Sequence, residues 1–255
     1  MSERLQTSPR LAALGRVAHG FSTRHGGVSK GIRASLDLND ADVALRTENW
    51  RRLLEDASAP PPSRVAWLEQ VHGDHVVRVD APSGVHEPVA RGDAAFTTES
   101  DLVLAVRTAD CVPVLVAGPG VVAVAHSGWR GTASDVVGAL VRALQDRVGV
   151  DPSDLVAAVG PAIGGDVYEV GAEVVDGLAS SGLPPEAYGH APSPDHPEDR
   201  AVVDLKAAVV AQLRRRGVVA VDVSSACTLR DTDLYSVRRE GPTTGRQAGF
   251  IARRS

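Results

Sequence analysis

Cys111 lies at one end of a predicted strand, where its thiol could take part in catalysis or metal binding. Cys111 follows Asp110 and precedes an apolar run (VPVLVAG), which a Pro-Gly pair joins to a second run (VVAVA) ending at His126. If the Pro-Gly pair is a two-residue hairpin turn, Pro113 faces His126 and Cys111 faces Gly128. Cys111 and His126 then share a face as diagonal neighbours, with roughly 7 Å or less between their Cβ atoms. A free cysteine is more commonly a small buried hydrophobic residue, and the nearby histidine favours a functional role.

A second histidine completes a set of metal ligands. His72 lies in WLEQVHG, between two predicted strands, whereas His75 begins the next strand and is expected to point to solvent. One cysteine and two histidines are a ligand set for Zn²⁺ with an open fourth position. Such a metal makes hydroxide near neutral pH. No short CxxC or HxxxH motif joins these residues, so three separate strand ends must bring them together.

The composition excludes several classes of protein. The 255 residues carry a net charge of -5, which argues against a nucleic-acid binder held by phosphate contacts. The two cysteines do not form a disulfide framework. No signal-peptide core is apparent, and the longest nearly apolar run is interrupted by Pro and Gly and is too short to span a bilayer. We predict a cytoplasmic protein with reduced thiols and no membrane partner.

The elements that must position these residues form a mixed α/β chain, an α+β arrangement with largely antiparallel sheets. A helical period predicts helices at Ser134–Val148, capped by Ser134 or Thr132, at Asp204–Arg216, and more weakly at Thr47–Asp56. The Pro-rich segment Ser180–Asp199 is predicted to be a surface excursion. Short valine-rich runs predict strands at Val65–Leu68, Val76–Val79, Leu102–Arg107, Val112–Ala117, Val121–Ala125, Leu155–Val159 and Val218–Val223.

Several segments, in order along nearly the whole chain, resemble the YfiH-type proteins, a family labelled both polyphenol oxidase/laccase domain and purine nucleoside phosphorylase. The most specific are QVHG, TADC and HSGWRG, and the others are FSTRHGGVS, GDAAFTT, VGPAIGGDVYEVG, ACT and LYSVRREGPTTGRQAGFI. The resemblance implies one catalytic domain over residues 1–255 with a layered α-β-β-α fold. It also implies that His72, Cys111 and His126 are the metal-binding and catalytic residues. Ala34–Val43 departs from the family pattern, being shorter and without its histidine, and Gly165 stands where a cysteine is common.

Family resemblance implies an enzyme that phosphorolyses adenosine, inosine and methylthioadenosine and also deaminates adenosine, with purine nucleosides and phosphate as its partners. Zinc is the expected metal and copper the alternative. Deamination by zinc-activated water needs a carboxylate to move protons, and Glu69, Asp93 and Asp110 are the candidates. A monomer or a homodimer is expected.

Phosphorolysis also needs cations that hold phosphate. Arg130, at a glycine-flanked helix start, is the first candidate, followed by Arg24 and Arg238. Tyr168 is a candidate for stacking on the base. Asp93 and Asp110 are candidates for orienting a metal ligand from behind.

Three rival functions were weighed. A multicopper laccase uses many histidines, usually in His-x-His pairs, and the eight histidines here include no such pair, although one copper ion could still give weak polyphenol oxidase activity. A metal-free hydrolase or amidase acting on cell-wall precursors would use Cys111 as nucleophile and His126 as base. A non-enzymatic protein with a structural zinc site would need a fourth ligand.

Overall fold

Two six-stranded sheets and one three-stranded sheet form the framework of the computed structural model, which describes residues 4–189, 191–193 and 199–255. The first sheet has the order β1 (Leu5–Gln6), β2 (Val17–Ser22), β15 (Gln247–Arg253), β7 (Val103–Thr108), β3 (Val65–Glu69) and β5 (Ala90–Arg91). The second has the order β14 (Ala220–Val223), β10 (Val156–Val159), β8 (Val112–Gly118), β9 (Val121–Ser127), β6 (Ala94–Thr97) and β4 (Val76–Arg78). The small sheet contains β11 (Glu169–Val170), β13 (Ala201–Val202) and β12 (Ala191–Pro192).

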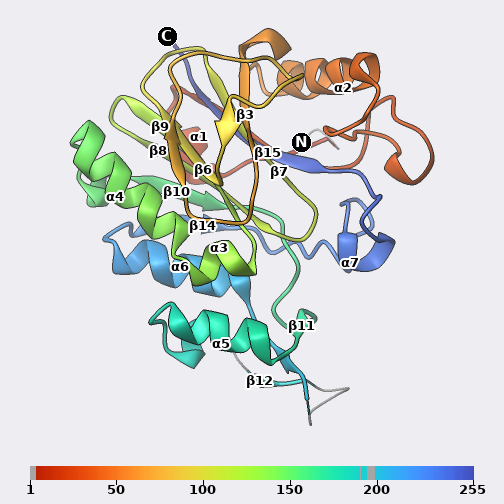
Figure 1. Ribbon diagram of the computed structural model, residues 1–255. Helices are drawn as coiled ribbons and strands as arrows, with labels where there is room; N and C mark the ends of the chain where they lie inside the picture. Colours follow the sequence, from red (N-terminus) through yellow and green to blue (C-terminus); the bar gives the residue numbers. More distant parts are fainter. Residues whose placement is uncertain (1–3, 190, 194–198) are drawn as a thin grey trace.

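Helices cover the outer faces of the two large sheets, with α2 on one side of the strands and α4 and α6 on the other, and α5 packs against α3 farther from the sheets (Figure 1). The α-helices are α1 (Pro9–Ala13), α2 (Val43–Asp56), α3 (Trp129–Ala133), α4 (Val136–Val148), α5 (Ala172–Ser180), α6 (Leu205–Arg215) and α7 (Val237–Glu240). Short 3₁₀ helices lie at η1 (Gly31–Arg33), η2 (Pro62–Arg64), η3 (Pro152–Asp154) and η4 (Pro185–Tyr188). None of the helices in the described part of the chain is long and apolar enough to cross a membrane.

The alternation of side chains along β8 builds two separate cores. Val114 and Val116 point to one face and join the cluster that includes the helix residues of α4 and α6. Leu115 and Ala117 point to the other face and pack with Leu104 and other residues of the first sheet. Because β8 is buried on both faces, its sequence is continuously apolar.

A third core closes the opposite outer face. Trp50, Leu53 and Leu54 of α2 pack against Val103 of β7 and Phe250 of β15. The clusters therefore lie in the order helices, sheet, sheet, helix, and the layered α-β-β-α arrangement with largely antiparallel sheets is confirmed.

The predicted elements are confirmed with shifts of one to a few residues at their ends, but the predicted cap of α4 is wrong. Ser134 ends α3, and its hydroxyl donates to the carbonyl of Arg130. Asp135 stands at the N-cap of α4 in a left-handed conformation, without capping through its side chain. Only two residues separate the end of α3 from the start of α4. Ser134, which could have capped α4, therefore lies at the C-terminal end of α3 instead. Strands β2 and β15 were not predicted, because a glycine interrupts the apolar alternation of each.

The segment predicted as a surface excursion, Ser180–Asp199, is only partly one. Leu183 and Tyr188 are buried against α6 and its neighbours, with exposures of 6% and 1%. Apolar side chains of this stretch therefore belong to the helix-side core. Residues 190 and 194–198 of the predicted excursion lie outside the described residues.

Candidate active site and metal centre

The β8–β9 hairpin brings Cys111 beside His126 in the expected register. Pro113 pairs with His126 and Val112 pairs with Ser127, so Cys111 falls opposite Gly128. A Cβ atom added to Gly128 would lie 3.0 Å from the Cys111 sulfur, closer than real Cβ contacts normally come. Glycine at this position therefore makes room for the thiol at the end of the strand.

His72 reaches the same place from a loop after β3. Its backbone is left-handed, with φ of 60°, which is uncommon for a residue other than glycine. The Asp93 carboxylate holds this loop by accepting the backbone N–H groups of Val71, His72 and Gly73 at 3.2, 3.0 and 2.7 Å. Three hydrogen bonds to one buried carboxylate offset the cost of the strained backbone.

The same carboxylate orients the buried histidine. His126 Nδ1 donates to Asp93 Oδ1 at 2.8 Å, and Asp93 is fully buried. This bond leaves Nε2 of His126 free to face Cys111, which is how metal-binding histidines are usually fixed. Asp93, a candidate for orienting a ligand, thus contacts both the His126 ring and the His72 backbone.

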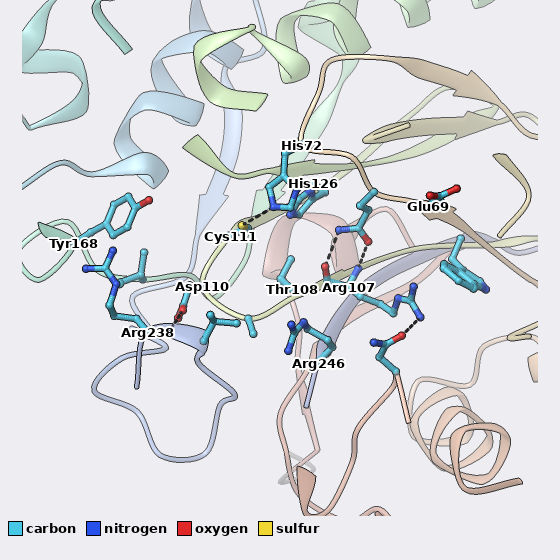
Figure 2. Close-up of a pocket in the computed structure, with 16 residues that line it drawn as sticks. Glu69, His72, Arg107, Thr108, Asp110, Cys111, His126, Tyr168, Arg238 and Arg246 are labelled. Atoms are coloured by element: carbon cyan, nitrogen blue, oxygen red, sulfur yellow. Dashed lines mark hydrogen bonds between the residues drawn. The ribbon is translucent and has the colours of Figure 1, made fainter. Parts of the chain in front are cut away.

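Three side chains of the described part of the chain form a group suited to a metal ion. The ligand atoms of His72, Cys111 and His126 all lie within 4.8 Å of one another, and His72 Nε2 is 4.0 Å from the Cys111 sulfur. The two imidazole rings meet edge to face, with centroids 4.8 Å apart. His126 is buried, Cys111 is half-buried and His72 is exposed, so the open side of the group faces a pocket (Figure 2). One sulfur and two imidazole nitrogens suit Zn²⁺ or copper.

Electrostatics also favour a thiolate in this group. Burial alone would raise the pKa of the Cys111 thiol, but the charge of His126 and hydrogen bonds from both histidines lower it. Burial would lower the pKa of His126, but Cys111 and Asp93 raise it. Burial opposes ionisation of Asp93, while its bonds to His126 and Gly73 lower its pKa overall. A metal ion binds thiolate rather than thiol, so the chain presents the correct form of the ligand.

Asp110 fixes the residue next to Cys111. Its backbone φ is 98°, and its two carboxylate oxygens accept the Thr228 hydroxyl at 2.6 Å and the Arg238 backbone N–H at 2.7 Å. The β8 end that carries Cys111 is thereby tied to two other segments of the chain. Among the described residues no hydrogen bond joins Asp110 to either histidine of the group.

The group opens into a pocket of about 700 Å³. Tyr168 and Arg238 line it on one side of the group, with the Arg238 guanidinium 5.2 Å from the Tyr168 ring centre (Figure 2). Glu69 and Asp110, two of the three carboxylates considered for proton transfer, also line the pocket. The complete lining is Asn39, Trp67, Glu69, Gln70, His72, Arg107, Thr108, Ala109, Asp110, Cys111, His126, Ile163, Tyr168, Val237, Arg238 and Arg246.

Two arginines considered for phosphate binding do not line this pocket. Arg24 forms an ion pair with Glu240 at 2.6 Å and donates to the carbonyls of Ala34 and Ile32. Arg130 is exposed and lies over the ring of its neighbour Trp129, 4.1 Å from the ring centre. Of the three arginine candidates, only Arg238 is a lining residue.

The sequence analysis missed other pocket residues that carry charge or hydrogen-bonding groups. They are Arg107, Thr108, Arg246, Gln70 and Asn39. A signal for the first two was available, because Arg107 and Thr108 lie only four and three residues before Cys111 in RTADC. Nothing local pointed to Arg246, which reaches the pocket only through strand pairing between β15 and β7.

Comparisons with known proteins give consistent results. The family model described as multi-copper polyphenol oxidoreductase laccase matches residues 18–254. A Streptomyces coelicolor protein named purine nucleoside phosphorylase SCO2081 is 43% identical, with 91% of this chain and 93% of that protein covered. The Geobacillus stearothermophilus purine nucleoside phosphorylase YlmD is 40% identical, with 94% and 91% covered. Its crystal structure has a TM-score of 0.88 over 97% of this chain and 94% of that one, at 37% identity. Bacillus licheniformis YfiH has a TM-score of 0.90 at 27% identity, with 99% and 97% covered.

Proposed function

This chain belongs to the multi-copper polyphenol oxidoreductase laccase family, which includes the YfiH-type proteins, and we propose that it is a purine nucleoside phosphorylase acting on adenosine, inosine and methylthioadenosine. We further propose that it deaminates adenosine at a zinc ion held by His72, Cys111 and His126. Relatives at 43% and 40% identity that carry the name purine nucleoside phosphorylase support the assignment. The single-domain organisation, the cytoplasmic location and the monomeric or homodimeric state stay predictions.

The observation that carries the proposal is a three-ligand group whose open side faces a pocket. The donor set is one thiolate and two imidazoles, and the Asp93 bond to His126 leaves the second ring nitrogen free for a metal. A metal ion bound there supplies Lewis acidity and lowers the pKa of a bound water. Structural zinc sites are normally closed by four protein ligands, so an open three-ligand group supports catalysis over the structural-zinc alternative.

Residues of the protein itself would bind the base and transfer protons during phosphorolysis. In phosphorolysis a phosphate oxygen forms a bond to C1′ of the ribosyl group as the bond from C1′ to the purine nitrogen breaks. The bonding electron pair leaves with the purine, which gains a proton. Tyr168 offers a ring for the base, and Glu69 and Asp110 are the pocket carboxylates able to move protons. Asp93 keeps both histidines in place through hydrogen bonds, and each of its two carboxylate oxygens already accepts two N–H groups.

The test is product analysis after incubation of the zinc-loaded protein with adenosine, with and without phosphate. Adenine and ribose 1-phosphate should form only with phosphate, and inosine should report deamination. C111A should abolish both, whereas C227A, which changes the cysteine outside the pocket lining, should retain them. Absence of turnover with adenosine, inosine and methylthioadenosine would contradict the proposal.

The geometry also favours one alternative, a metal-free cysteine hydrolase or amidase acting on cell-wall precursors. Asp93, His126 and Cys111 follow one another as carboxylate, imidazole and thiol, the order found in cysteine hydrolases. Peptide-amide hydrolysis that survives chelation of metal would favour this function. A copper ion in the same group could support weak polyphenol oxidase activity, but the described residues contain only this one group of three or more metal-binding side chains.

A further inference from the structure

Thr108 has a buried hydroxyl that no described residue satisfies. It is the last residue of β7, lines the pocket beside the metal-binding group, and is 2% exposed. Its Oγ1 has no hydrogen-bond partner within the described part of the chain. Buried hydroxyls in folded proteins are normally hydrogen-bonded, because an unpaired one costs free energy. A hydroxyl of this kind on a pocket wall indicates a ligand with an acceptor oxygen.

Arg107, the preceding residue, brings a cation to the same pocket without an anionic partner. Its guanidinium lies 3.6 Å from the ring centre of Trp67, and its Nη1 donates to the amide oxygen of Asn39. Gln70 holds the Arg107 backbone, accepting its N–H and donating to its carbonyl, both at 2.8 Å. Among the described residues no ion pair of Arg107 with a carboxylate is recorded. Burial and the charge of Arg46 lower the pKa of Arg107 to about 10, which still leaves it charged at neutral pH.

Strand pairing places a second cation beside the first. Gln247 of β15 pairs with Thr108, so the preceding residue, Arg246, comes to the same edge of the sheet. Among the described residues its guanidinium donates only to backbone carbonyls, those of Thr244, Gly245 and Pro242. Arg246 is half-buried, and burial lowers its pKa.

A carboxylate that acts on both arginines, Asp37, is already engaged by other groups. Asp37 is fully buried, pairs with Arg33 at 3.2 Å, and accepts the backbone N–H groups of Asn39 and Arg246. Burial raises the pKa of Asp37, and no hydrogen bond joins its carboxylate to the guanidinium of Arg107 or Arg246 among the described residues. Two half-buried guanidinium groups without an ion pair to a carboxylate among the described residues, and one unpaired hydroxyl, therefore share a pocket wall.

We propose that Arg107, Thr108 and Arg246 form the subsite for inorganic phosphate, next to the metal-binding group. This inference rests on the proposed function and replaces Arg130 as the first candidate for holding phosphate. Guanidinium groups and a hydroxyl are the donors that recognise phosphate oxygens. Figure 2 shows Thr108 between the metal-binding group and Arg246, below the group in this view, and Tyr168 to the left of the group. Phosphate bound at Thr108 and a base at Tyr168 would place the ribose near the metal-binding group.

The test is calorimetric titration of inorganic phosphate into the zinc-loaded, full-length protein, without nucleoside. T108V and R246Q should each weaken phosphate binding by at least about tenfold, the loss expected for one hydrogen bond to a charged group. T108V should keep wild-type thermal stability in the absence of phosphate, because its hydroxyl makes no hydrogen bond within the described chain. R147Q is the matched control, since the Arg147 guanidinium also lies over an aromatic ring, 5.0 Å from the Phe96 ring centre, but outside the pocket.

Other outcomes would overturn the subsite. Wild-type phosphate affinity in both T108V and R246Q would do so, and a loss confined to R130Q would move the phosphate to the start of α3. A parallel titration with adenosine 5′-monophosphate separates free phosphate from phosphate carried on a substrate. Binding of the nucleotide but not of inorganic phosphate would refute the proposal.

Steady-state kinetics separate failure of the subsite from failure of the proposed function. If adenosine is phosphorolysed, T108V should raise the KM for phosphate and leave the KM for adenosine unchanged. Phosphorolysis with an unchanged KM for phosphate in T108V would retain the function and reject the subsite. Phosphate binding that depends on Thr108 and Arg246, without phosphorolysis of any nucleoside, would retain the subsite and reject the function.

Discussion

Replacing Asp93 by asparagine should weaken metal binding and destabilise the fold together. Each carboxylate oxygen accepts two donors: Oδ1 those of His72 and His126, and Oδ2 those of Val71 and Gly73. An asparagine has one acceptor oxygen, so its amide NH₂ would face two donors whichever way it turned. A buried donor left unpaired costs about 1–3 kcal/mol, so the two together cost roughly 2–6 kcal/mol.

The expected effects of D93N are large enough to measure directly. A loss of 2 kcal/mol lowers Tm by about 4 °C or more in a chain of this size. Zinc affinity should fall about 10–100-fold, the usual effect of removing the group that orients a metal-binding histidine. Competition with a chromophoric chelator measures the affinity, and thermal unfolding measures the stability.

A matched control for this prediction is D151N. Asp151 is an exposed carboxylate that accepts the backbone N–H of Ser153 at 2.9 Å, so its replacement removes a charge at the surface only. D151N should leave zinc affinity unchanged. If D93N bound zinc as tightly as the wild type, Asp93 would not orient the metal ligands, and the reasoning would be refuted.

Three further predictions concern the same hairpin and the first sheet. G128A should weaken zinc binding, because the added methyl group would lie 3.0 Å from the Cys111 sulfur. G73A is the control, since its methyl group would meet no atom closer than 3.7 Å. In the same chelator assay G73A should bind zinc more tightly than G128A. After removal of the metal, Cys111 should react quickly with iodoacetamide, because its pKa is lowered. Cys227 should react at the same rate with and without zinc, and mass spectrometry measures the labelling of both cysteines. Slow labelling of Cys111 in the metal-free protein would contradict its thiolate character. Burial lowers the pKa of His19 below 6.5 in the folded protein. As the pH falls, the unfolded chain therefore takes up a proton on this histidine before the folded chain does. The free energy of unfolding should then decrease below pH 6.5, by up to about 1.4 kcal/mol per pH unit. Urea unfolding of the wild type and of H19Q at pH 7.5 and 5.5 measures the contribution of His19 to the free energy of unfolding. An equal pH dependence of the two proteins would count against this prediction.

The local sequence pattern was sufficient to predict how the β8–β9 hairpin places Cys111 beside His126. The Pro-Gly turn fixes the β8–β9 register, and the two-residue period of a strand then determines which side chains share a face. The observed pairing of Pro113 with His126 follows from that rule alone. Apolar runs likewise predicted seven of the fifteen strands in the described residues, among them β7, β8 and β9 at the centre of the sheets, because strands buried on both faces are continuously apolar.

Local pattern failed where the decisive contacts join distant segments. The approach of His72 depends on a left-handed backbone and on a carboxylate from another part of the chain, Asp93. Local pattern also gave no way to choose among the arginines: Arg130, at a helix start, is exposed beside Trp129 and is not a lining residue of the pocket, and its role in phosphate binding stays a prediction.

The residue patterns of the sequence therefore determined the hairpin, the chemical types of the metal ligands and a mixed α/β class with largely antiparallel sheets, whereas the layered α-β-β-α arrangement came from the family resemblance. The tertiary structure alone decided which cations reach the pocket. Arg246 stands beside Thr108 only because β15, from the end of the chain, pairs antiparallel with β7 in one particular register. Such a register is set by the packing of whole sheets against the cores rather than by neighbouring residues, which is why no local motif could reveal it.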